Sequence, residues 1–182
     1  MSSIEVPTLK TQRLILRPFS LEDADEVYRN FASDEQVTRF LAFDPPRNVS
    51  EARDTINTWC MYCSVPAYFH WAIELIPLGE VIGSLRGIVT EATSVASLDA
   101  CIGRPWWNQG LMTEALAAVM PFFFNTLSIS CLTACHHPDC PAAGHILRNF
   151  GFQPEGIRRR QGYSNQGVYD EICYSLLRSE LL

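Results

Sequence analysis

The stretch RPWWNQGLMTEAL at residues 104–116 sets two tryptophans, a turn and a helical pattern in direct succession. The apolar spacing after Gly110 predicts a helix, and the first N–H groups of a helix have no partner within it. These groups lie at the positive end of the helix dipole, where phosphate binds readily, and a glycine lets a ligand approach the backbone. The segment therefore predicts an anion site, although it matches neither GxxxxGK[S/T] nor GxGxxG. The alternative is an ordinary strand-to-helix turn whose tryptophans pack in the core.

Thiols and imidazoles form the second set of reactive side chains. CMYC at 60–63 has the C-x-x-C spacing, and CLTACHHPDC at 131–140 carries three cysteines and two histidines. Zinc binds to such ligands, but here they fall in a predicted helix and a predicted strand, without a standard spacing. An odd total of seven cysteines and the lack of a signal-peptide core argue against a disulfide framework. We therefore expect buried free thiols and no metal, with structural zinc as the alternative.

Composition limits the classes of protein and partner. The chain has 182 residues, 47% hydrophobic and 19% charged, which is typical of one globular domain over 1–182. A net charge of −6 argues against a nucleic-acid partner bound through its phosphates. Because no apolar run reaches the length of a membrane span, we expect no membrane partner and a cytoplasmic location.

The elements that must position these groups follow from periodicity and breakers. The run at 13–19 predicts a strand, and 20–31 predicts a helix that begins near a capping box formed by Ser20 and Asp23. A second helix is expected at 49–63 with Ser50 as its cap, and Pro121 should kink or end the helix at 110–124. The remaining predictions are strands at 69–75, 81–87, 94–103, 128–137, 152–163 and 168–177, and a helix at 141–151. This succession favours one α/β domain with a mixed sheet.

Three segments resemble the GCN5-related N-acetyltransferases: RLILRPFSLEDA near the N-terminus, HWAIELIPLGEVIGSL in the centre, and GFQPEG at 151–156. The chain looks most like the ribosomal-protein N-acetyltransferase branch, from about Leu9 to Leu177. This resemblance implies a single mixed α/β domain. Its central sheet would have about six to seven strands with a splayed parallel pair, flanked by about four helices.

The resemblance also implies acetyl-coenzyme A as co-substrate. In this family a loop before the central helix holds the pyrophosphate through backbone N–H groups, and the pantetheine arm lies between the splayed strands, here 97–103 and 129–136. One N–H near Ile102 would polarise the thioester carbonyl. The residues implied to bind the cofactor are Cys101, Ile102, Arg104, Trp107, Asn108, Gln109, Gly110, Leu111, Met112, Thr113, Cys140 and Arg148.

The family's usual acid and base are missing from their positions. Ala143 stands for a serine, Leu147 for a tyrosine and Ser97 for a glutamate. A further glutamate of the ribosomal-protein enzymes falls near Gly162. Cys140 replaces an asparagine. We expect it to serve only as a small, polarisable side chain at that position; the alternative is that its thiol forms a covalent acyl intermediate.

Asp99 and His137 are therefore the candidates for moving the proton of an attacking amine. Asp99 lies on the strand beside the expected carbonyl, and a histidine titrates near neutrality. His136 and His137 are adjacent on a strand, so only one of them can face the cleft. The alternative for each candidate is a solvated or hydrogen-bonded structural residue.

We expect an N-acetyltransferase that works by direct attack in a ternary complex. The acceptor is a primary amine, either a small molecule or a protein N-terminus, and homodimer formation stays open. An acyl-coenzyme A-binding protein without turnover is the alternative.

Strand alternation in IRRRQGY predicts Arg158 and Arg160 on one face and Arg159 on the other. These charges could protect an edge strand from aggregation, or they could attract an acidic substrate.

Overall fold

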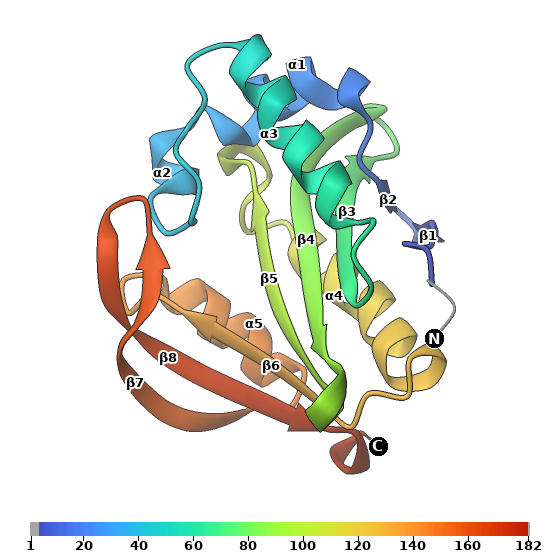
Figure 1. Ribbon diagram of the computed structural model, residues 1–182, viewed down its shortest axis with the longest axis vertical. Helices are drawn as coiled ribbons and strands as arrows, with labels where there is room; N and C mark the ends of the chain where they lie inside the picture. Colours follow the sequence, from blue (N-terminus) through green and yellow to red (C-terminus); the bar gives the residue numbers. More distant parts are fainter. Residues whose placement is uncertain (1–3, 182) are drawn as a thin grey trace.

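The computed structural model describes residues 4–181, and within them eight strands form one sheet in the order β1-β2-β3-β4-β5-β6-β8-β7 (Figure 1). Neighbouring strands are antiparallel except β5 and β6, which are parallel. The strands are β1 (Leu9–Lys10), β2 (Leu14–Pro18), β3 (Tyr68–Leu75), β4 (Glu80–Thr90), β5 (Val95–Ile102), β6 (Cys131–His136), β7 (Gln153–Ser164) and β8 (Gly167–Leu177).

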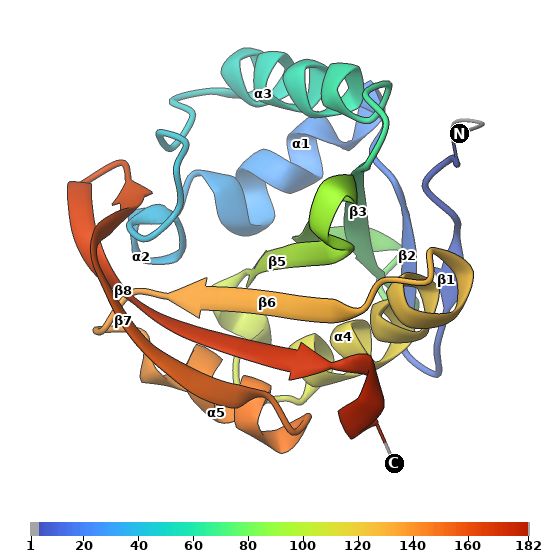
Figure 2. The same ribbon diagram turned by 60° about the horizontal axis from the view of Figure 1, so that its bottom comes forward.

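Helices cover both faces of the sheet (Figure 2). One face carries α4 (Leu111–Pro121) and α5 (Pro141–Asn149), and the other carries α1 (Ala24–Val27) and α3 (Val49–Tyr62). The short helix α2 (Glu35–Thr38) lies near the β7–β8 hairpin, which places the loop after α2 close to the end of β6. No helix within residues 4–181 is long and apolar enough to cross a bilayer.

The predicted fold class is confirmed, and three details differ. The sheet has eight strands rather than six to seven, because the short β1 adds an outer strand to β2. The helix expected at 20–31 is broken into a 3-10 turn, α1 and a π turn over Tyr28–Ala32. Asn48, not Ser50, caps α3, since its side chain accepts the N–H of Glu51 at 2.9 Å. Helix α4 ends at Pro121 as predicted.

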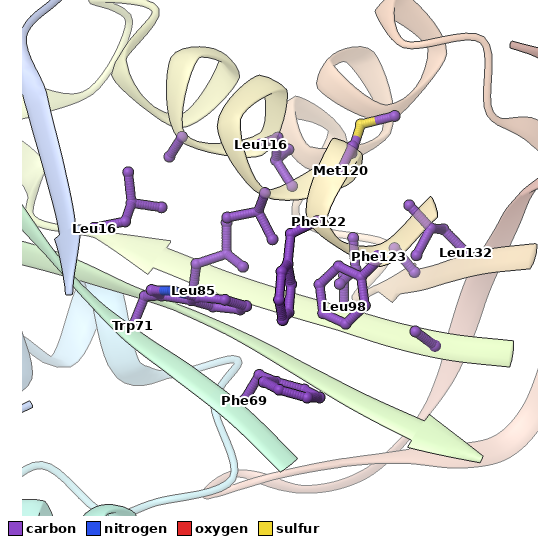
Figure 3. Packing of buried hydrophobic residues seen from close by; sticks show 14 of the residues in the cluster. Leu16, Phe69, Trp71, Leu85, Leu98, Leu116, Met120, Phe122, Phe123 and Leu132 are labelled. Carbon is purple, nitrogen blue, oxygen red and sulfur yellow. The ribbon is translucent and has the colours of Figure 1, made fainter. Parts of the chain in front are cut away.

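The main core lies between α4 and the sheet (Figure 3). Phe122 and Phe123 follow α4 and pack edge-on against Phe69 and Trp71 of β3. Gly87 in β4 leaves room for the Phe123 ring, because a β-carbon there would overlap it. This packing fixes the end of α4 against β3 and β4.

The opposite face holds a second cluster, in which His70 of β3 is enclosed by aromatic rings. The imidazole is 3% exposed, and its ring centroid lies 5.0 Å from that of Phe19 and 4.8 Å from that of Trp59. Its Nδ1 is buried and has no hydrogen-bond partner in the part of the chain that the structure describes. Burial, helped by the positive charge of Arg86, lowers the pKa of His70 from 6.5 to about 3.

This histidine should make folding sensitive to mild acid. Because the unfolded chain takes up the proton below pH 6.5 and the folded chain only near pH 3, the stabilisation is complete above 6.5 and is lost as the pH falls. Between pH 7 and 5 the loss is about 2 kcal/mol. His70→Phe should flatten the pH dependence of urea unfolding by that amount. His145→Gln, at an exposed position, should leave it unchanged; parallel curves for wild type and His70→Phe would contradict this assignment.

Candidate active site

The parallel pair β5 and β6 separates halfway along its length. Pairing runs from Val95 opposite Cys131 to Leu98 opposite Ala134, and then it stops. Beyond that point Asp99–Ile102 pair only with β4, while Cys135 and His136 pair only with β8. A gap therefore opens between the two strands, and its backbone edge on β5 is available to a ligand.

The pairing pattern shows which groups face this gap. Gly103 donates its N–H to the carbonyl of Ile82 at 2.8 Å, so odd-numbered residues of β5 point their backbone groups at β4. Ala100 and Ile102 consequently face the gap, whereas the backbone of Cys101 faces β4. The carbonyl of Ile102 accepts the indole N–H of Trp107 at 2.7 Å. The backbone N–H of Ile102 itself has no acceptor within residues 4–181.

The loop before α4 presents unpaired amides. No backbone N–H from Asn108 to Thr113 donates to any acceptor within residues 4–181. Residues 107–110 are exposed, and Asn108 (φ 58°) and Gly110 (φ 73°) adopt left-handed conformations. Successive amides in such a loop make an anion-binding concavity at the positive end of the helix. The predicted site therefore has the free donors that it needs.

Arg13 holds this loop, and the sequence did not reveal its role. Its guanidinium donates to Glu114 in the first turn of α4 at 2.7 Å and to the carbonyl of Gln109 at 3.0 Å. The backbone N–H of Arg13 and the hydroxyl of Thr11 bind the same carboxylate. A cation thus lies beside the anion site, but the contact joins positions 101 residues apart, which no local pattern indicates.

The two arginines that were expected near phosphate are both engaged by the protein. Arg104 pairs with Asp34 and also reaches Gln36 at 3.2 Å, so its guanidinium is directed toward α2. Arg148 on α5 donates to the hydroxyl of Tyr174 at 2.8 Å. Either can meet a coenzyme only by giving up these contacts or by sharing them.

Asp99 has the geometry of an accessible base. Two nitrogens of Arg86 contact its Oδ2 at 2.7 and 2.8 Å, and no donor within residues 4–181 contacts Oδ1. The side chain is 50% exposed and points away from Leu98, which packs in the core beneath α4. Burial raises the pKa of the Asp99 carboxyl above 3.8, against the opposing effect of Arg86.

The two histidines at the end of β6 point to opposite faces, as predicted. His137 stacks on Phe40, with ring centroids 4.4 Å apart, and its Nδ1 accepts the N–H of Asp139 at 3.0 Å. That bond occupies the lone pair a base would use, so the geometry favours Asp99 over His137. His136 is buried with its Nε2 toward Gly144 of α5, and this nitrogen has no hydrogen-bond partner among the described residues.

Tyr169 of β8 is a candidate that the sequence did not reveal. Its ring lies against His137, with centroids 4.6 Å apart, and it packs directly over Gly162. The glycine found where the family carries a glutamate therefore makes room for this ring. Burial raises the pKa of the Tyr169 phenol, and the negative charges of Glu171 and Asp99 add to the effect. The phenol is thus a protonated group close to the gap.

Cys140 and Leu147, at opposite ends of α5, differ in their surroundings. Cys140 caps the helix and its thiol makes no cap hydrogen bond within residues 4–181, whereas Leu147 is buried in the core at 5% exposure. The ligands of the alternative, a zinc site built from 60–63 and 131–140, do not converge: within residues 4–181 the one group of potential ligands is Cys135, Glu171 and Cys173. Six of the seven cysteines are only partly buried, whereas we had expected buried thiols.

The predicted alternation of Arg158, Arg159 and Arg160 is wrong. The pairing of β7 with β8 shifts between Arg158 and Gly162, and Arg160 has a left-handed φ of 53°. An irregularity of this kind breaks the two-residue period of side chains. Arg158 instead pairs with Glu171 at 2.7 Å.

An acetyltransferase (GNAT) domain matches residues 13–153, most of the chain. The protein therefore belongs to the GNAT acetyltransferase family, the class of acyl-coenzyme A-dependent N-acetyltransferases, which confirms the resemblance drawn from the sequence.

Two curated relatives span nearly the same length. The uncharacterized N-acetyltransferase YoaA of Bacillus subtilis (strain 168) is 29% identical over 173 residues, covering 94% of this chain and 97% of that protein. The ribosomal protein uS5-alanine N-acetyltransferase of Escherichia coli (strain K12) is 25% identical over 167 residues, covering 87% and 84%.

Solved structures share the fold. RimJ of Mycobacterium smegmatis in complex with CoA-disulfide has a TM-score of 0.86 at 21% identity, covering 97% of this chain and 90% of that one. The microcin C7 self-immunity acetyltransferase MccE, in complex with acetyl-CoA and AMP, has a TM-score of 0.80 at 17% identity, covering 92% and 93%.

Gly110→Val should weaken coenzyme A binding at least tenfold by isothermal titration calorimetry. The branched side chain would stand among the free amides, where a β-carbon meets only Arg13 at 3.7 Å. The backbone strain of a valine at positive φ should lower stability without unfolding the protein.

Gly79→Val is the matched control. Gly79 has a similar φ of 68°, open space around it, and a place in the β3–β4 turn, outside the loop before α4. It should suffer the same strain with unchanged affinity. Equal affinities for the two variants would contradict the anion site at Gly110.

Proposed function

We propose that this protein transfers the acetyl group of acetyl-coenzyme A to a primary amine by direct attack within a ternary complex. The observation that carries this proposal is the run of unpaired amides from Asn108 to Thr113, at the start of α4, in a chain whose parallel strands separate after Leu98. The amides would bind the diphosphate, and the free β5 edge would bind the pantetheine arm.

Positioning supplies much of the chemistry in this proposal. An amine that is held against a thioester needs little more than alignment, a neutral nitrogen and a donor to the carbonyl oxygen. The N–H groups of Ala100 and Ile102 are the donors proposed for that oxygen. A single donor of this kind contributes about 3 kcal/mol to the transition state.

Asp99 is proposed to take the proton from the amine. Its Oδ1 is free, and Arg86 grips only Oδ2, so the carboxylate is oriented without being covered. The raised pKa makes it a somewhat stronger base than an ordinary aspartate. His137 has its Nδ1 occupied and is better suited to hold Tyr169 and Phe40 in place.

Tyr169 is proposed to protonate the departing thiolate of coenzyme A. The phenol lies beside His137 at the end of β6, and its raised pKa keeps it protonated at neutral pH. The tyrosine that serves as acid in related enzymes would fall at Leu147, which is buried, so the acid must come from another element. Here β8 supplies it from the opposite side of the gap.

The acceptor is proposed to be a small amine or an extended protein N-terminus. Asn165, at the tip of the β7–β8 hairpin, donates to the carbonyls of Thr38 and Phe43 at 3.0 Å, and its N–H binds Leu41 at 2.8 Å. We propose that this bridge between the hairpin and the loop after α2 limits the access of a folded surface to Asp99. The ribosomal specificity of the relative in Escherichia coli makes ribosomal-protein N-terminal peptides part of the panel to test.

Two substitutions and a change of leaving group should separate the two proton carriers. We expect Asp99→Asn to lower kcat about 10²-fold or more at pH 7, with coenzyme affinity within twofold, because general-base catalysis is lost. Tyr169→Phe should slow the reaction most with acetyl-coenzyme A, whose thiolate must be protonated on leaving. An acetyl donor with an acidic thiophenol leaving group, used in place of acetyl-coenzyme A, needs no proton on leaving. This donor should largely rescue the Tyr169→Phe variant and should not rescue Asp99→Asn.

Thiol release from acetyl-coenzyme A across amines and N-terminal peptides is the assay. Ser97→Ala, on the same strand face as Asp99, is the matched control and should keep full activity. Coenzyme binding without turnover on a wide panel would overturn the transferase proposal in favour of an acyl-coenzyme A-binding protein. Full activity of Asp99→Asn would remove the carboxylate from the reaction.

A further inference from the structure

Cys135 of β6 and Cys173 of β8 lie directly opposite each other, with their sulfur atoms 2.7 Å apart. The N–H of Arg178 bonds to the carbonyl of Ser130 at 2.9 Å, which places the hydrogen-bonded pairs of these strands at even positions of β6. Cys135 and Cys173 therefore form a non-hydrogen-bonded pair, whose Cα atoms are about 4.5 Å apart in an antiparallel sheet. That separation lies within the range over which a disulfide closes.

The surroundings of the two thiols differ. Cys135 is half-buried, and Nη2 of Arg158 lies 3.1 Å from its sulfur. Cys173 is buried at 5% exposure. The thiols line a hollow between β6, β7 and β8 together with Thr133, Glu155 and Ile157, so a small reagent can reach Cys135 first.

A metal ion fits this site less well. The ligand atoms of Cys135, Cys173 and Glu171 lie within 4.8 Å of one another, which allows a common cation. However, the guanidinium of Arg158 already binds Glu171 at 2.7 Å and would stand beside the ion. Two thiolates on one tetrahedral zinc are about 3.8 Å apart, given zinc–sulfur bonds of about 2.3 Å. The observed 2.7 Å is far shorter.

We propose that Cys135 and Cys173 are a redox modification site, which forms a reversible disulfide in the folded protein on reaction with hydrogen peroxide. The Cys135 thiolate attacks the peroxide oxygen to give a sulfenic acid and water. The Cys173 sulfur then displaces the hydroxyl as a second water, so the two thiols lose two electrons and two protons and one peroxide is reduced. Small thiols restore the pair by disulfide exchange.

The protonation state of the Cys135 thiol governs the rate of its oxidation. Burial and the neighbouring Cys173 sulfur raise the pKa of Cys135 to about 12, against the effect of Arg158. The other charged groups near the pair are Glu155 of β7 and Glu171 of β8. Because the thiolate is scarce at neutral pH, oxidation should accelerate as the pH rises. The closed bond would tie β6, one wall of the gap, to β8.

The test is to treat the folded protein with hydrogen peroxide and to map the thiols by non-reducing peptide mass spectrometry. We expect the loss of two thiols and of two hydrogen masses, a link between the peptides that carry Cys135 and Cys173, and full reversal by dithiothreitol. The linked form should unfold roughly 5–10 °C higher, since the bond closes a long loop of the unfolded chain.

Cys135→Ser and Cys173→Ala should each abolish this link, and thermal unfolding of each untreated variant checks that it is folded. Cys131→Ser, four positions earlier on the same face of β6, is the matched control and should leave the link intact. A link that joins other cysteines, or one that persists in Cys135→Ser, would overturn the proposal. So would one equivalent of zinc that is retained by the wild type and lost in Glu171→Gln.

Discussion

Backbone amides without partners are costly unless water or a ligand satisfies them, and the account of this protein depends on such a run at the start of α4. The core beneath α4 fixes the far end of the helix, because Phe122 and Phe123 pack edge-on against β3. The pairing of Arg13 with Glu114 fixes the near end. Packing and charge elsewhere in the molecule thus keep the amides from Asn108 to Thr113 without acceptors among residues 4–181.

The gap between β5 and β6 determines in which direction a ligand bound at these amides can extend. In the proposed binding mode, a coenzyme at α4 runs along β5 toward Asp99, which pairs with Arg86 of β4 on the face of the sheet opposite α4. Tyr169 reaches this face from β8, and His137 stacks between it and Phe40. The altered family positions then form a consistent set: Gly162 admits the Tyr169 ring, and Leu147 joins the core. The dithiol of Cys135 and Cys173 lies on the same face, one pleat before His137.

Local patterns predicted most of the architecture, because hydrophobic periodicity and breakers act over a few residues. The strand–helix succession, the end of α4 at Pro121 and the open loop at Gly110 were all read in this way. Groups set by distant pairing were missed. Arg13 meets Glu114 only through the fold, and Tyr169 meets His137 only because β8 inserts beside β6. The arginine alternation failed because one left-handed residue, Arg160, shifts the register of β7.

The central claim is that the amides before α4 bind a diphosphate, and amide-resolved NMR during a coenzyme A titration tests it most directly. The account predicts large ¹⁵N–¹H shift changes from Asn108 to Thr113 and at Ala100 and Ile102. With pantetheine, which lacks the diphosphate, only Ala100 and Ile102 should respond. Saturable coenzyme A binding that leaves the loop amides unmoved would contradict the claim.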